Sequence, residues 1–139
     1  MHCSLKVLTV LFTLFVSHQT FGQKIKCYNQ KADTIKFIKV SLVDLMTNPN
    51  NYSGQWIETE GIYYNGFEYS TVGLEQKMNS KTKLASFWVD FDKKIDCFPN
   101  LSPFNETKVL LRGKINLNKH GHLSNYDADI DNVYYIEQL

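Results

Sequence analysis

Three stretches of the chain carry the marks of β-strands, and two of them alternate between apolar and polar residues, the pattern of a strand with one buried face. The clearest alternation covers residues 84–92, and residues 108–117 repeat it. Residues 55–64 are rich in β-branched and aromatic side chains, which favour strands. The predicted inward face of the first stretch carries Phe87, Val89 and Phe91. A chain with these patterns is predicted to be largely β.

Two further strands complete the predicted sheet. Asn65-Gly66 is a strong hairpin-turn signal, and residues 67–74 are expected to form the strand that follows it. A fifth strand is predicted over residues 123–131, and residues 133–139 are expected to form an apolar tail that packs on the core. The inward side chains expected on the fifth strand are Tyr126, Ala128 and Ile130.

Two glycines favour a barrel over a flat sandwich. Gly61 and Gly113 each lie inside a predicted strand, where glycine weakens the strand unless a bulge or a sharp bend needs it. Small closed barrels need such bends at their corners. One short helix is also predicted over residues 42–47, because Ser41 and Asp44 form a capping box ahead of it and a proline follows it.

A family resemblance rests on five motifs that cover most of residues 40–131. They are VSLVDL at 40–45, NPNNYSG at 48–54, IETEG at 57–61, FWVDF at 87–91 and VLLRG at 109–113. In these motifs the chain resembles the bacterial exported OB-fold proteins, whose barrel is similar to that of anticodon-binding-like OB domains. The resemblance implies an all-β fold: a small five-stranded Greek-key OB-type barrel with a short N-terminal helix. Many members also have a helix between the third and fourth strands, whereas residues 97–107 have weak helical character here.

The N-terminus has the layout of a secretory signal peptide. Lys6 precedes an apolar run over residues 7–16, and polar and small residues follow it up to Gly22. This run is too short to span a bilayer as a helix, which needs about 20 residues. We therefore predict a signal peptide over 1–22, a leader over 23–39 that begins as a loose polar segment, and a barrel domain over 40–139. The protein is expected to be exported, to the periplasm or the medium, with no membrane span after cleavage.

Charge and cysteine content follow from that cleavage. The 139-residue chain has 15 Lys and Arg against 14 Asp and Glu, and the signal removes only Lys6, so the mature charge is 14 − 14 = 0. A neutral chain has little long-range attraction for nucleic acid. Cys27 and Cys97 remain after Cys3 is removed, and a pair in an oxidising compartment is a disulfide candidate. The alternative is two free thiols, since the sequence does not show the distance between them.

The expected ligand surface follows from the barrel type. OB-type barrels bind through the outer face of their second and third strands and the adjoining loops. The candidate ligand-binding residues on that surface are Trp88, Phe67, Tyr69, Tyr64 and Lys83. An aromatic face stacks on sugars or nucleobases, at about 1–3 kcal/mol per base. The alternative is that these rings fill the core or pair across strands, and Trp88 is the one whose alternation phase points outward.

No pattern in the sequence supports catalysis, a metal or a cofactor. His120 and His122 could both reach a metal, but a tetrahedral site needs further ligands. Asp127, Asp129 and Asp131 fit the outer face of a strand better than a calcium loop, whose glycine and bidentate glutamate are missing. There is no nucleophile elbow and no phosphate-binding loop. We predict a protein that is not an enzyme and holds no metal and no cofactor.

Two functions are compatible with these patterns. The leading prediction is an exported binding module for an unknown protein, glycan or small molecule. The alternative is a single-stranded nucleic-acid-binding OB domain, which would need a lysine stripe such as Lys77, Lys81 and Lys83 beside the aromatic residues. Export and zero mature charge argue against nucleic acid. A third option, an enzyme using Asp90, Asp92 or His120, has no supporting constellation.

Overall fold

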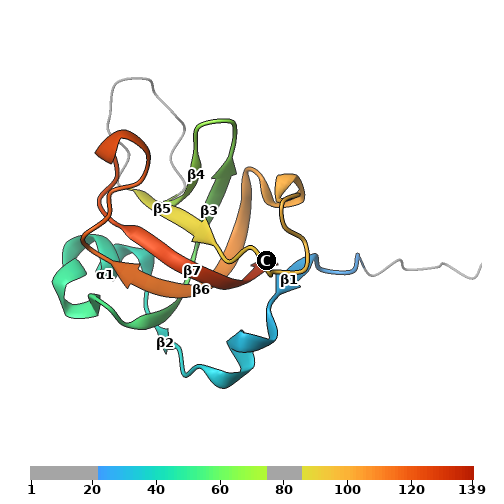
Figure 1. Ribbon diagram of the computed structural model, residues 1–139, viewed down its shortest axis with the longest axis horizontal. Helices are drawn as coiled ribbons and strands as arrows, with labels where there is room; N and C mark the ends of the chain where they lie inside the picture. The colour runs from blue at the N-terminus through green and yellow to red at the C-terminus, as the bar shows by residue number, and fades with distance from the viewer. Residues whose placement is uncertain (1–21, 75–85) are drawn as a thin grey trace, which may run out of the picture.

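The chain folds as a closed β-barrel in a computed structural model that describes residues 22–74 and 86–139 (Figure 1). The barrel strands are β3 (Trp56–Asn65), β4 (Ser70–Gly73), β5 (Ser86–Phe91), β6 (Thr107–Asn116) and β7 (Asp129–Gln138). Around the barrel the order is β3-β4-β5-β7-β6 and back to β3, with β5 and β7 parallel and the other pairs antiparallel. The predicted all-β, five-stranded Greek-key barrel is confirmed. Lys83 and residues 1–21 lie outside the described residues.

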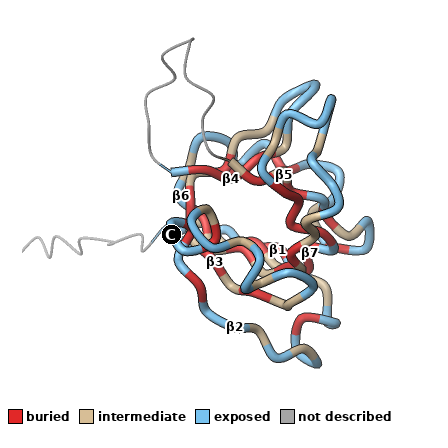
Figure 2. The backbone as a smooth tube through the Cα atoms, turned by 90° about the vertical axis from the view of Figure 1, so that its left-hand side faces the viewer, coloured by how far each residue is buried: buried red, intermediate tan, exposed pale blue. Residues whose placement is uncertain are grey.

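The barrel encloses one hydrophobic core. Alternate residues of the strands point inward, and Figure 2 shows the buried segments along the barrel strands, while the β2 segment and many loop stretches are exposed. Gly113 belongs to this packing, because a Cβ there would lie 2.7 Å from Ile130 Cγ2, next to a register shift between β6 and β7. The largest fully buried residues on the strands are Tyr63, Phe87, Ile57, Leu111, Ile115, Ile130 and Ile136.

Within residues 22–74 and 86–139, helices are few and short. The helix α1 (Leu42–Thr47) has the predicted bounds, and Ser41 Oγ accepts a hydrogen bond from the Asp44 N–H at 3.1 Å, as the capping box requires. Leu42 and Leu45 are buried. The other helical segments are single 3₁₀ turns: η1 (Gln30–Thr34), η2 (Pro49–Tyr52), η3 (Ser102–Phe104) and η4 (His122–Ser124). Among the described residues, no helix has the length and hydropathy to cross a membrane.

The leader is part of the sheet, which differs from the loose segment expected at its start. β1 (Lys26–Tyr28) pairs antiparallel with the end of β7, and β2 (Ile38–Lys39) pairs parallel with the beginning of β3. Between them, the leader covers the outer face of β3 and β7. The rings of Phe37 and Trp56 are perpendicular, with their centroids 6.0 Å apart, and Trp56 stacks on Tyr134 at 5.5 Å. Trp56 is therefore occupied by packing within the protein.

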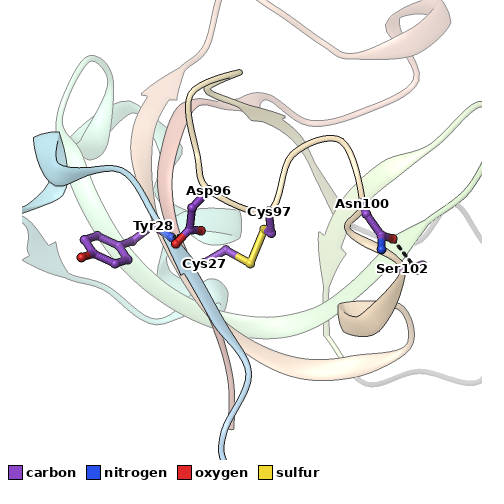
Figure 3. Close-up of a disulfide and its surroundings, with 6 residues drawn as sticks. All are labelled: Cys27, Tyr28, Asp96, Cys97, Asn100 and Ser102. Carbon is purple, nitrogen blue, oxygen red and sulfur yellow. Dashed lines mark hydrogen bonds between the residues drawn. A yellow bond between two sulfur atoms is a disulfide. The ribbon is translucent and has the colours of Figure 1, made fainter.

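A disulfide joins the leader to the loop after β5, so the candidate pair is crosslinked and the alternative of two free thiols is wrong (Figure 3). Cys27 on β1 and Cys97 lie with their Cα atoms 5.6 Å apart. Hydrogen bonds beside it tie the same two segments: the Tyr28 N–H donates to Asp96 Oδ1 at 3.0 Å, and the Asp96 N–H donates to the Tyr28 carbonyl at 3.2 Å. Further along the loop, Ser102 Oγ donates to Asn100 Oδ1 at 2.7 Å.

The hairpin between β3 and β4 is wider than the predicted two-residue turn. Asn65 still pairs with Ser70, so residues 66–69 form a four-residue loop. The Gly66 N–H donates to the Tyr69 carbonyl at 2.8 Å across it. Asn65 is held in the strand because its N–H donates to Asn105 Oδ1 at 2.8 Å, a contact forty residues away that no local turn signal contains.

The predicted fifth strand was wrong in its position. β7 begins at Asp129, and residues 133–138 are its second half rather than a packed tail. The chain ahead of it cannot be extended, because Gly121, Leu123 and Ser124 have positive φ values and form the η4 turn. The burial of Ala128 and Ile130 was predicted correctly, but Tyr126 lies ahead of the strand and does not face the core.

Candidate functional site

The candidate site begins with a row of side chains across the outer face of the barrel. The strand register places Thr71 of β4 opposite Trp88 of β5, and Trp88 opposite Asp129 of β7. Directly paired residues share one face of a sheet, and the alternate positions on β5 are buried in the core. Trp88 therefore points outward, as its alternation phase predicted, and Asp129 lies beside it on the next strand.

The loop between β6 and β7 folds back over this row. Gly121 in that loop has φ 61° and ψ −157°, a conformation that essentially only glycine adopts. Its backbone also lies against the indole, since a Cβ there would stand 2.7 Å from Trp88 Cβ and 2.5 Å from a ring carbon of Tyr126. Glycine is thus required twice at this position, for its backbone angles and for the space it leaves to Trp88.

Two more rings surround the indole of Trp88. The centroid of Tyr126 lies 5.2 Å away with the planes tilted by 57°, and that of His122 lies 6.5 Å away with the planes at 29°. Trp88 remains half-buried. Beside it the loop leaves an open pocket of about 470 Å³, within the size range of small-molecule sites. The pocket is lined by Trp88, Asn118, Lys119, His120, Gly121, His122, Ser124 and Asp129.

Two buried carboxylates of β7 lie under the loop, and they differ in how fully they are hydrogen-bonded. Asp131 is satisfied: Lys119 Nζ lies 3.1 Å from its Oδ2, and Asn116 Nδ2 donates to the same oxygen at 2.7 Å. This hydrogen-bonded contact with Asp131 raises the pKa of Lys119. Asp129 is only 4% exposed, and its Oδ1 has no hydrogen-bond partner among the described residues.

The environment of Asp129 disfavours its charged form. Burial raises the pKa of Asp129, and the nearby charges of Asp131 and Asp90 raise it further. A hydrogen bond from the Gly121 N–H and the charge of Lys119 act in the opposite direction without cancelling the effect of burial. The pocket therefore has a carboxylate in its wall that the protein itself leaves partly unpaired.

The structure divides the predicted ligand-binding residues into two groups. Tyr64 pairs with Thr71 and so lies on the same outer face as Trp88, two strands away. Phe67 and Tyr69 lie outside that row, in the β3–β4 hairpin loop, where Phe67 is 99% exposed and the ring of Tyr69 packs over Gly66. Lys83 lies outside the described residues.

Sequence reasoning missed Tyr126, Gly121 and Asp129 as parts of this site. Tyr126 was expected in the core, and it packs on Trp88 outside the barrel. Asp129 and Asp131 were expected on the outer face of a strand, which is correct, but the loop buries both of them. No local pattern signals this arrangement, because it depends on a loop folding over strands that are distant in sequence.

Other features of the described residues offer less for binding. A second depression of about 370 Å³ lies between α1, β2 and β3; no aromatic residue lines it, and an ion pair of Glu60 with Lys108 at 3.1 Å lies at it. Within residues 22–74 and 86–139, the one cluster of potential metal ligands is Cys27, Asp96 and Cys97, whose two sulfurs are bonded to each other. Binding through an aromatic surface is what the Trp88 arrangement can do chemically.

We compared the chain with known protein families, curated proteins and solved structures. No protein-family model, no curated protein and no solved structure matches it.

Proposed function

We propose that this protein is an exported, non-enzymatic binding module that holds its ligand on the outer face of β4 and β5. The observation that carries the proposal is the setting of Trp88: the indole faces outward, stays half-exposed and forms the wall of an open pocket. The loop against it depends on a glycine that no other residue replaces without strain. Aromatic surfaces of this kind bind sugar rings, peptide side chains and nucleobases.

Charge supports this function over the alternative, a single-stranded nucleic-acid-binding domain. Acidic residues lie near Trp88 along the chain and in the neighbouring loop. Asp90 lies two residues further along β5, and Asp127 donates its backbone N–H to the carbonyl of Ser86, two residues before Trp88. Both are exposed. A nucleic-acid groove requires the opposite sign, because phosphate contacts supply most of the affinity. The lysine stripe that the alternative needs lies outside the described residues.

Export and membership of the exported OB-fold group belong to the same proposal. The strand order of the barrel is compatible with an OB-type fold, and the Cys27–Cys97 disulfide is consistent with an oxidising compartment. Intact-mass measurement of the protein from cell fractions tests export. We expect a chain that begins near Gln23 outside the cytoplasm, and a full-length chain retained in the cytoplasm would contradict export.

Tryptophan fluorescence tests the binding proposal directly, because the chain has only two tryptophans. A Trp56→Phe variant leaves Trp88 as the single reporter, and Trp56 packs under the leader away from the site. We expect at least one member of a panel of oligosaccharides and short peptides to change the Trp88 emission saturably, and an oligothymidine to leave it unchanged. Isothermal titration calorimetry, which needs no tryptophan reporter, should then show binding lost in Trp88→Ala and kept in Trp56→Phe. A ligand that binds Trp88→Ala with unchanged affinity would place the site elsewhere.

A further inference from the structure

We propose that the Trp88 pocket binds a cationic group, the guanidinium or ammonium of a basic side chain on a partner peptide, between the indole face and the carboxylate of Asp129. This inference rests on the proposed function, because it names the ligand chemistry of the same site. It is carried by the charges around the pocket, by the unpaired oxygen of Asp129 and by the aromatic rings beside it.

The charge around the pocket is negative and only partly neutralised. Lys119 lies at the site, but it is committed to Asp131 at 3.1 Å. Asp90 and Asp129 form no salt bridge with any described residue. Asp90 follows Trp88 by two positions on the same outward face of β5, so two carboxylates of different strands flank the indole. A cation entering the pocket meets an attractive field, and an anion meets a repulsive one.

The carboxylate of Asp129 is buried without a full set of hydrogen-bond partners, which is the second observation that supports a cation. A buried polar atom without a partner has lost its hydrogen bonds to water and gained none within the protein, which destabilises the folded state. Asp129 is 4% exposed, its Oδ1 is unpaired among the described residues, and the residue lines the pocket. Such departures from satisfied burial occur at functional sites in natural proteins. A cation held in the pocket supplies the opposite charge that Asp129 lacks.

The aromatic rings beside Asp129 are the third observation that supports a cation. The face of a tryptophan is the best aromatic surface for a cation, and arginine is the cation most often found on one. The ring of Tyr126, 5.2 Å from the indole, adds a second aromatic surface at an angle, and the ring of His122 lies 6.5 Å from the indole. Two rings at an angle next to a carboxylate form part of the cage that recognises ammonium and guanidinium groups. Neutral sugars would use the rings but not the acid.

A matched peptide pair tests this proposal. The probes are acetyl-Ala-Arg-Ala-amide and the same peptide with citrulline, which keeps the shape of arginine and removes its charge. They are titrated against the protein as its host processes it, carrying Trp56→Phe, with Trp88 emission as the readout. We expect the arginine peptide to bind about tenfold more tightly than the citrulline peptide. We also expect its affinity to fall as NaCl rises from about 50 to about 500 mM, while that of the citrulline peptide stays constant.

Two variants locate the charge. Asp129→Asn should remove most of the preference for the arginine peptide. Asp33 is an exposed acid on η1 of the leader, and Asp33→Asn should leave the preference unchanged.

Equal affinity for both peptides, or an unchanged preference in Asp129→Asn, would overturn the cation inference. If neutral oligosaccharides then still bind through Trp88, the proposed function survives that failure. If no probe of either kind reaches Trp88, both the inference and the proposed function are wrong. The salt titration needs no site variant, so it decides the question even where Asp129→Asn fails to fold.

Discussion

At the scale of single residues, the site depends on Gly121, which sets the conformation of the loop beside Trp88. Its backbone angles lie in a region reserved for glycine, and its Cα lies against the indole of Trp88. Its N–H also donates a hydrogen bond to Asp129. One residue thus sets the path of the β6–β7 loop, leaves room for the aromatic wall and partly satisfies the buried acid.

We predict that Gly121→Ala lowers the free energy of unfolding by about 1–3 kcal/mol, the cost of a strained backbone conformation. The added methyl group would also push the loop away from Trp88, so the Trp88 emission should shift to the red in the Trp56→Phe background. Gly54→Ala is the matched control, because Gly54 also has a positive φ, of 72°, but has open space around it. It should lose stability without a change in Trp88 emission. Equal emission in both variants would contradict this account of Gly121.

The second residue-scale prediction concerns Asp129, whose pKa is raised by burial. The folded state then holds the proton more tightly than the unfolded chain, where the pKa of Asp is about 3.9. Stability is therefore lost as pH rises through the interval between the unfolded and the folded pKa, and the loss is complete above it. Asp90, Asp131 and Lys119 all act on this carboxyl, and His120 and His122 line the same pocket.

Asp129→Asn should accordingly stabilise the protein at about pH 7, by about 1 kcal/mol, because it removes an uncompensated buried charge. The gain should shrink as the pH falls towards about 3.5, where the wild-type carboxyl is protonated. Urea denaturation at several pH values measures this difference. Asp33→Asn serves as the exposed control, for which no such trend is expected. A variant that is less stable than wild type at neutral pH would show that the carboxylate is a structural group.

At the scale of elements, β1 is a strand of only three residues that joins the leader to the barrel. Its pairing with β7 is reinforced by the Cys27–Cys97 disulfide and by two hydrogen bonds between Tyr28 and Asp96. The two cysteines are 70 residues apart in sequence, so the crosslink closes a long loop in the unfolded chain. A long closed loop is where a crosslink restricts the unfolded ensemble most.

We predict that Cys27→Ala combined with Cys97→Ala costs about 2–4 kcal/mol in the free energy of unfolding. Hydrogen exchange should show faster exchange in β1, with little change in β3 and β6. Denaturation of the reduced wild-type protein should reproduce the stability of the double variant, which serves as the check on side-chain packing effects. Unchanged exchange in β1 would mean that the bonds to β7 alone hold the leader.

At the scale of the whole molecule, the strictly alternating strands and the capped helix were predictable from sequence. β5, β6 and α1 lie within about two residues of their predicted bounds, because periodicity and capping are local signals. The position of β7 was not predictable, since Leu123 and Ser124 adopt left-handed conformations that these residue types rarely signal. The outward direction of Trp88 was also predictable, because the alternation of residues that sets it is a local signal. Its contacts with Tyr126 and Asp129 were not, because they join separate strands through a folded-back loop.

The net charge of the whole chain and the charges beside Trp88 both disfavour binding to nucleic acid. The mature chain predicted by cleavage after Gly22 has 14 basic and 14 acidic residues. The exposed acids Asp90 and Asp127 flank the aromatic site. Phosphate contacts supply most of the affinity for single strands, so neither the net charge nor the local charge favours binding. Fluorescence anisotropy with a labelled oligothymidine at about 150 mM NaCl should therefore show no saturable binding.

Reversing the two flanking charges provides the matched comparison. Asp90→Lys combined with Asp127→Lys keeps Trp88 and changes the sign of the field beside it, so weak binding that disappears with added salt should emerge. That gain would show that the aromatic surface can stack on bases and that charge alone excludes them in the natural protein. Saturable, strongly salt-dependent binding by the wild-type chain would instead restore the nucleic-acid function and show that the acidic surroundings of Trp88 do not exclude phosphate.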